Sequence, residues 1–239
     1  MQRRIDSLVF RPLLIAVFAV AMAYLEAAVV VYLRNLYYPD GFTFPLRLIP
    51  VSVILIEIGR EAATLVILFI IPWIMAKCRW ERFGWFLFVF GIWDIFYYFW
   101  LKVLVNWPSS VLDWDVLFLI PVPWISPVIA PVMVALSMCV IGYWMIYITN
   151  SGHSFRPGAI GWTLGLIGTA FILYSFMGDT GAIFHHELPK PYLYWLLTLG
   201  ISSYWIGFLV SIRRSVQAKS NAQSWINELV EKSFQTYLQ

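Results

Sequence analysis

The sequence predicts an all-α integral membrane protein: a bundle of about six transmembrane helices with a proline- and tryptophan-rich outer cap and a C-terminal amphipathic helix. Hydrophobic residues make up 61% of the 239 residues, and charged residues only 12%. Soluble domains carry about 25% charged residues, so this chain has too few charges to cover a water-exposed surface. The apolar residues also gather in runs of about 20, the length that crosses a bilayer.

The apolar runs predict six spans joined by short polar connections. They cover residues 12–33, 48–75, 83–105, 127–149, 159–178 and 192–212. The first run is too long for the apolar core of a secretory signal peptide, so we expect it to be retained as a span. Residues 1–214 then form the predicted bundle, and residues 215–239 a separate cytoplasmic tail.

Basic residues predict the orientation of this bundle. Eleven of the sixteen Lys and Arg residues fall on the side that holds both termini, and four fall on the other side. Because cytoplasmic loops are enriched in Lys and Arg, both termini are predicted in the cytoplasm and the protein in the plasma (inner) membrane. The lipid bilayer is therefore an expected partner. Nucleic acid is not, since no Lys/Arg run is long enough to follow a phosphate backbone.

Segment 106–131 interrupts the helical pattern with five prolines. It reads NWPSSVLDWDVLFLIPVPWISPVIAP. An interior proline removes a backbone hydrogen bond and clashes with the preceding turn. We therefore expect a short helix or re-entrant piece around residues 112–120, followed by an irregular turn, with the whole segment capping the outer face. One long, kinked helix is the alternative, since membrane helices tolerate proline.

The tail has the periodicity of an amphipathic helix. Its apolar residues recur at helical spacing between polar ones and are Trp225, Ile226, Leu229, Val230, Phe234, Tyr237 and Leu238. This pattern is typical of a helix that lies on the membrane surface or against a partner protein.

Charged residues inside the predicted spans are the main functional signal. They are Glu26 in the first span, Glu57, Arg60 and Glu61 in the second, and Asp94 in the third. The i, i+3, i+4 spacing places the three charges of the second span on one helix face. A charge at the bilayer centre costs about 2.5–3.5 kcal/mol on insertion scales, so these groups should face the protein interior and have partners there.

Four carboxylates in this set face one guanidinium, with at most Lys102 besides. Full ionisation would leave at least two uncompensated negative charges at low dielectric constant. Protonation, a bound cation or access of water would relieve that surplus. The five residues are therefore predicted to bind or conduct a cation or a proton, in transport or in an energy-coupled membrane complex.

A structural interpretation stays open beside the functional one. Arg60 could pair with Glu57 and Asp94 to fix the helix register. Glu26 and Glu61 would then be protonated or reach water. In that case the protein would be an accessory or structural subunit of a larger assembly, formed with partner membrane subunits or with further copies of itself.

A weaker candidate site lies in the last outer loop, where His185 and His186 follow Asp179. Imidazole and carboxylate groups together can bind Zn, Cu or Fe. A metal ion would then be the cofactor of a metal-dependent membrane enzyme. However, the spacing matches no zinc-protease or di-iron motif, and a solvated loop has the same composition. The sequence also lacks facing histidines for haem and a mid-span lysine in the last helix for retinal. Whether the protein is an enzyme stays open.

Overall fold

The structure, a computed structural model, describes residues 10–47, 49–152 and 155–237, and after Ser215 it describes the backbone with only a few side chains. Its elements, in chain order, are α2 (Arg11–Tyr37), α3 (Val51–Met75), α4 (Arg79–Val105), β1 (Trp114–Phe118), β2 (Trp124–Pro127), α5 (Ile129–Asn150), α6 (Ala159–Met177), α7 (Gly181–Phe184) and α8 (Tyr194–Tyr237). The long helices form on the predicted apolar runs, and the first five of them end within a few residues of the predicted positions.

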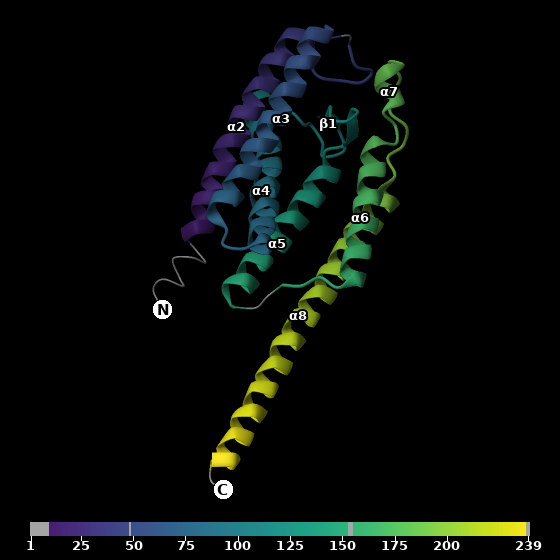
Figure 1. The fold of residues 1–239 in the computed structure, drawn as a ribbon. Helices are drawn as coiled ribbons and strands as arrows, with labels where there is room; N and C mark the ends of the chain where they lie inside the picture. The colour runs from purple at the N-terminus through teal and green to yellow at the C-terminus, as the bar shows by residue number, and fades with distance from the viewer. Residues whose placement is uncertain (1–9, 48, 153–154, 238–239) are drawn as a thin grey trace.

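The long helices form two groups (Figure 1). Helix α4 packs against α2, α3 and α5, and α6 packs against α8. The groups meet where α6 contacts β2 and where α5 contacts α8. The strands and α7 lie at one end of the bundle, which we call the hairpin end. Helix α2 begins, and α8 ends, at the opposite end.

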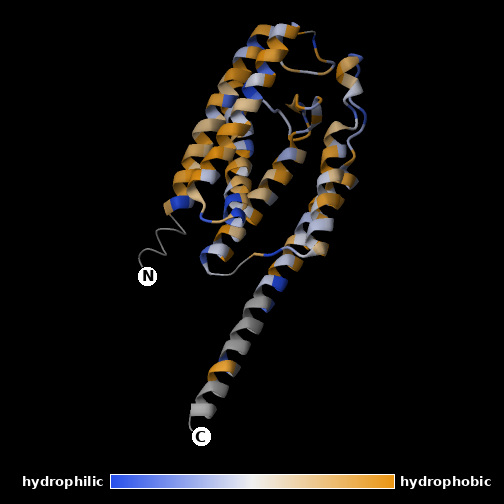
Figure 2. Ribbon diagram, in the orientation of Figure 1, coloured by the Kyte–Doolittle hydropathy of each residue, from blue (hydrophilic) through white to orange (hydrophobic). Residues whose placement is uncertain are grey.

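The helices of the bundle consist mainly of hydrophobic residues along their length (Figure 2). Within the described ranges, five helical segments are long and apolar enough to cross a membrane: α2, α4, α5, the run from α6 through α7, and α8 as far as Ser215. Large apolar side chains such as Leu13, Ile74 and Trp195 are exposed. Soluble proteins rarely expose apolar surface on this scale. Helix α3 coincides with the remaining predicted span and carries three of the charged residues.

The predicted helix around residues 112–120 is wrong, and so is the alternative of one long kinked helix. Strands β1 and β2 instead form an antiparallel hairpin in which Asp115 pairs with Ser126 and Val116 with Ile125. Paired strands satisfy their backbone N–H and C=O groups with each other, which a buried segment needs. The fold is therefore not purely α-helical.

The predicted boundary between bundle and tail does not coincide with a break in the chain's structure. Helix α8 runs without interruption for 44 residues and extends beyond the bundle at the end opposite the hairpin (Figure 1). The sixth span and the tail therefore form one helix. Most side chains of the amphipathic pattern, from Trp225 onward, lie outside the described residues, so that pattern stays a prediction.

Helices α4 and α5 approach closely because glycines face the neighbouring backbone. A Cβ atom added at Gly91 would lie 2.5 Å from the carbonyl oxygen of Ala135, and one added at Gly142 would lie 2.6 Å from that of Gly84. Small residues at such positions let helix backbones pack in lipid, where the hydrophobic effect does not drive association. This contact fixes α4, the helix that carries Asp94.

Gly91→Ala should lower the free energy of unfolding by about 1–3 kcal/mol, the usual cost of overpacking, because the new methyl group has no room beside Ala135. Gly59→Ala is the matched control. A Cβ atom at Gly59, also inside a helix, would meet no heavy atom within 4 Å, so helix propensity alone should stabilise that variant by up to about 1 kcal/mol. Chemical unfolding in mixed micelles measures both. Equal effects of the two substitutions would contradict the close α4–α5 contact.

Candidate functional site

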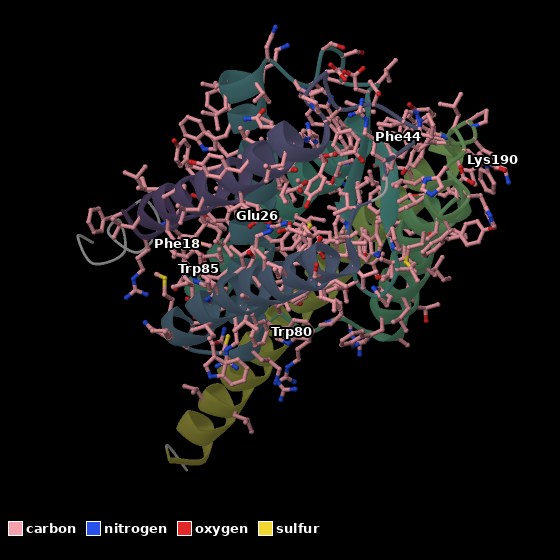
Figure 3. All side chains as sticks on the ribbon, turned by 90° about the horizontal axis from the view of Figure 1, so that it is seen from above. Phe18, Glu26, Phe44, Trp80, Trp85 and Lys190 are labelled. Atoms are coloured by element: carbon pink, nitrogen blue, oxygen red, sulfur yellow. The ribbon has the colours of Figure 1, made fainter. Side chains whose placement is uncertain are left out.

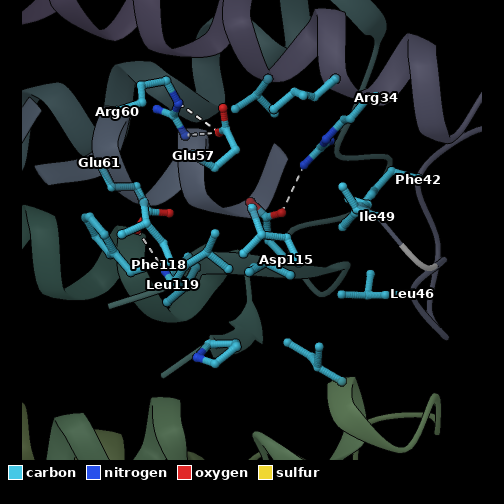
Figure 4. Close-up of a pocket in the computed structure, with 18 of the residues that line it drawn as sticks. Arg34, Phe42, Leu46, Ile49, Glu57, Arg60, Glu61, Asp115, Phe118 and Leu119 are labelled. Atoms are coloured by element: carbon cyan, nitrogen blue, oxygen red, sulfur yellow. Dashed lines mark hydrogen bonds and ion pairs between the residues drawn. The ribbon is translucent and has the colours of Figure 1, made fainter. Parts of the chain in front are cut away.

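A cavity of about 490 Å³ opens at the hairpin end, between α2, α3, α4, the segment that follows α2, and the hairpin (Figure 4). Its walls include five carboxylates and three guanidinium groups, from Glu26, Glu57, Glu61, Asp94, Asp115, Arg34, Arg47 and Arg60. The structure therefore brings all five residues of the predicted ion site to one cavity. Their role there stays a prediction.

Arg60 links α3 to α2 through its side chain. Its Nε donates a hydrogen bond to Glu57 Oε2 (2.8 Å), one turn earlier on α3, and its Nη1 donates to Glu26 Oε1 on α2. Thr64 Oγ1 donates to the other oxygen of Glu26 (3.0 Å). Viewed from above, Glu26 lies between the two helices rather than on the outside (Figure 3). The predicted face of α3 therefore points inward and holds α3 against α2.

Glu61, on the same face of α3, connects that helix to the hairpin. Its Oε2 accepts a hydrogen bond from the backbone N–H of Leu119 (2.9 Å), in the turn between the strands. The side chain is buried, with a residue exposure of 6%. A single carboxylate thus satisfies a backbone donor of the turn and fixes the position of the turn relative to α3.

Asp94 has a different environment from the three glutamates. It lines the cavity from α4, and it has no hydrogen bond or ion pair with any residue that the structure describes. The structural interpretation had paired Arg60 with both Glu57 and Asp94. The Glu57 pair is present, but the second partner of Arg60 is Glu26. Three aromatic residues of α4, Trp93, Tyr97 and Tyr98, line the cavity near Asp94.

The cavity also contains an ion pair that the sequence did not predict. Arg34 Nη2 donates to Asp115 Oδ1 (2.9 Å), and both side chains are buried. The Arg34 guanidinium lies over the rings of Phe42 (4.2 Å from Cζ to the centroid) and Trp107 (3.8 Å). Burial raises the pKa of the Asp115 carboxyl above its ordinary value, although the Arg34 charge acts in the opposite direction. In the sequence, Asp115 is an Asp between Trp and Val in a strand-like run, and this pattern alone is a weak indication of a buried ion pair.

The charge balance of the cavity is negative. Five carboxylates face two buried guanidinium groups, those of Arg34 and Arg60. Arg47 lies at the rim, where its side chain is 53% exposed, and it pairs with Asp40 outside the cavity (3.1 Å). Arg34 and Asp115 add one positive and one negative charge, so they do not remove the excess of carboxylates that the sequence predicted.

The three residues of the suggested metal site do not share a partner or a common position. Asp179 accepts a hydrogen bond from the backbone N–H of Lys190 (2.6 Å), and His186 Nδ1 donates to the carbonyl of Leu46 (3.0 Å). His185 is exposed. Across the described ranges, no three His, Cys, Asp or Glu side chains come together as a group that could hold a metal ion. The structure thus does not assemble these three residues into a ligand set.

The candidate site thus consists of acidic side chains from three helices and a hairpin around one cavity, with too few cationic side chains to neutralise them. Comparison with known proteins finds no matching family model, no similar curated protein and no similar solved structure.

Proposed function

We propose that this chain is an integral membrane protein of six spans, with both termini in the cytoplasm, that binds a cation or a proton in the cavity at the hairpin end. Transport, or a role in an energy-coupled membrane complex, would use such a site. The observation that carries the proposal is the excess of cavity carboxylates over guanidinium groups. Intramembrane ionisable groups are costly and are typically functional.

Helix α3 is the span of this proposal that is not among the five apolar segments named above. Its charged and polar side chains face the cavity, and Glu61 and Thr64 are buried. The opposite surface presents exposed apolar side chains, including Val66 and Ile70, to the surroundings. A helix with this distribution suits a bilayer as long as its polar face is covered by protein. The basic α3–α4 connection, at the end opposite the hairpin, supports a cytoplasmic location for that end.

The excess charge explains why the site would bind a cation. Glu26 and Glu57 share the charge of Arg60, and Asp115 uses that of Arg34. Glu61 has only a backbone N–H, and Asp94 has no partner among the described residues. Two carboxylates at low dielectric constant cannot both remain charged without a counterion or bound protons. We expect protons to be held near neutral pH and to be released when a cation enters.

A proton titration tests this function. Purified protein in phosphatidylcholine nanodiscs should bind protons in the near-neutral range and release some of them when Na⁺ is added. Glu57→Gln and Asp94→Asn should each reduce the number of protons bound in that range, because each removes a titrating carboxyl group. Equal titration curves for the wild type and both variants, with stability intact, would refute the ion site.

Asp113→Asn is the matched control for this titration. Asp113 lies outside the cavity, where its carboxylate accepts hydrogen bonds from Ser109 and Ser110. Partial burial acts to raise its pKa, but these hydrogen bonds outweigh burial and lower the pKa below the ordinary value. The group therefore stays ionised near neutral pH. Its replacement removes one carboxyl group, as Asp94→Asn does, and should leave the near-neutral proton count unchanged.

One observation favours a second candidate function, an accessory subunit of a larger membrane assembly. Helix α8 continues beyond the bundle (Figure 1) and would offer a partner an extended surface. In that case the buried charges serve only to hold helices together. The two functions differ in the titration: a purely structural set of ion pairs would release no protons when Na⁺ is added.

A further inference from the structure

The walls of the cavity are mostly apolar, which a metal ion or a proton does not need. Besides the charged groups, the lining includes Leu33, Ile49, Val53, Ile54 and Leu117. Binding sites for organic molecules typically combine such walls with a few polar groups, and their volumes are about 300–1,000 Å³. The cavity volume of about 490 Å³ lies in that range.

The carboxylates do not converge on one point. Glu26, Glu57 and Glu61 each accept hydrogen bonds from the protein, so their oxygens are directed at Arg60, Thr64 and the Leu119 amide. Asp94 is the cavity carboxylate without a hydrogen bond or ion pair in the described part of the chain. Asp94 is therefore the carboxylate that offers both of its oxygens to a bound cation.

Aromatic residues of the same helix line the cavity together with this carboxylate. Trp93, Tyr97 and Tyr98 line the same cavity. The rings of Trp93 and Tyr97 are stacked with their centroids 6.5 Å apart, and those of Tyr97 and Tyr98 meet edge to face at 5.0 Å. The faces of aromatic rings attract organic ammonium groups, which lose less hydration than small inorganic ions when they bind there.

Three buried polar atoms of the cavity residues have no hydrogen-bond partner within the described part of the chain. They are Trp93 Nε1, Arg34 Nη1 and Asp115 Oδ2, on side chains whose residues are 4%, 8% and 2% exposed. A buried donor or acceptor that remains unpaired costs about 1–3 kcal/mol. All three residues line the cavity. The polar part of the wall that a charged head group would meet therefore extends beyond Asp94 to these residues.

We propose that the cation is an organic ammonium with an apolar body, bound with its charge at Asp94 among the aromatic rings and its apolar part along the wall toward the opening. This inference rests on the proposed function and narrows it to a class of ligand. The class is an amphipathic amine, whose two parts match the two parts of the cavity.

A series of ligands with a common tail tests the ligand class. Dodecylammonium, dodecanol and dodecanoate share an apolar chain and differ in head-group charge. Binding of each is measured on protein-containing phosphatidylcholine nanodiscs, with empty nanodiscs subtracted to remove partition into lipid. Dodecylammonium should bind at least about tenfold more tightly than the other two, because only its head group offers Asp94 a counter-charge. Dodecanol binding as tightly as dodecylammonium would overturn the proposal.

The Asp94→Asn variant should lose at least about tenfold in dodecylammonium affinity, whereas Asp113→Asn, outside the cavity, should bind as the wild type does. Equal binding by Asp94→Asn and wild type would overturn the proposed position of the charge. Proton release on addition of Na⁺ tests the ion site separately from the organic ligand class. If Na⁺ releases protons and dodecylammonium does not bind, the ion site holds and the organic ligand class is wrong. If neither occurs, both fail.

Discussion

Arg60→Gln is expected to lower the free energy of unfolding by about 2–3 kcal/mol, with the measurement made by chemical unfolding in mixed micelles. The substitution leaves Glu26 and Glu57 without their shared cation, and the side chains of these glutamates are only 10% and 13% exposed. Removing one partner of a fully buried ion pair costs about 3–5 kcal/mol, and the 20% exposure of the Arg60 side chain reduces that figure.

Two further variants isolate the cause of this loss. Glu26→Gln combined with Arg60→Gln should recover part of the stability, because one of the two unpaired charges is gone. Arg47→Gln breaks a similar ion pair with Asp40 in which both side chains are exposed, and it should cost less than about 1 kcal/mol. If Arg60→Gln and Arg47→Gln cost the same, Arg60 does not neutralise a buried cluster.

The helices could be predicted because each is long relative to its connections. An apolar run of about 20 residues leaves few alternatives in chain conformation, since a lipid-exposed backbone must satisfy its own hydrogen bonds. The i, i+3, i+4 spacing of Glu57, Arg60 and Glu61 is likewise a local pattern, and it correctly indicates one shared face. Local periodicity thus determines which residues of α3 turn inward.

The partners of those residues could not be predicted in the same way. Glu26 and Arg60 are 34 residues apart, and Arg34 and Asp115 are 81 apart. Such pairs depend on how α2 packs against its neighbours, and the local spacing of residues does not indicate this packing. The hairpin was missed for a related reason. Strand pairing joins two short segments, and each segment alone also fits an irregular turn broken by proline.

The end of the last span was predicted to within a few residues. Its continuation into the tail as one helix was missed, because polarity is a poor guide to where a helix stops. The chain after Arg214 becomes polar, which marks the expected edge of the bilayer. A helix may nonetheless continue into water when it contains no proline or glycine to end it, and residues 208–237 contain neither. Composition therefore indicated the change of environment correctly, but it did not indicate a change of conformation.

Arg34→Gln is expected to have the largest effect on stability, a loss of about 3–5 kcal/mol. Asp115 is 2% exposed and would be left as a buried, unpaired carboxylate in β1. Stacking of the guanidinium on Phe42 and Trp107 would be lost as well. Chemical unfolding measures the total loss, and amide hydrogen exchange in the hairpin should show that β1 and β2 open more often.

The choice of replacement separates charge from shape. Arg34→Lys keeps the positive charge but loses the planar group that can stack on two rings and bond Asp115 at once, so it should recover only part of the lost stability. Asp115→Asn combined with Arg34→Gln removes both charges and should be more stable than Arg34→Gln alone. If the double variant is no more stable, the cost comes from lost packing on the aromatic rings, and the Arg34–Asp115 pair does not hold the hairpin over the cavity.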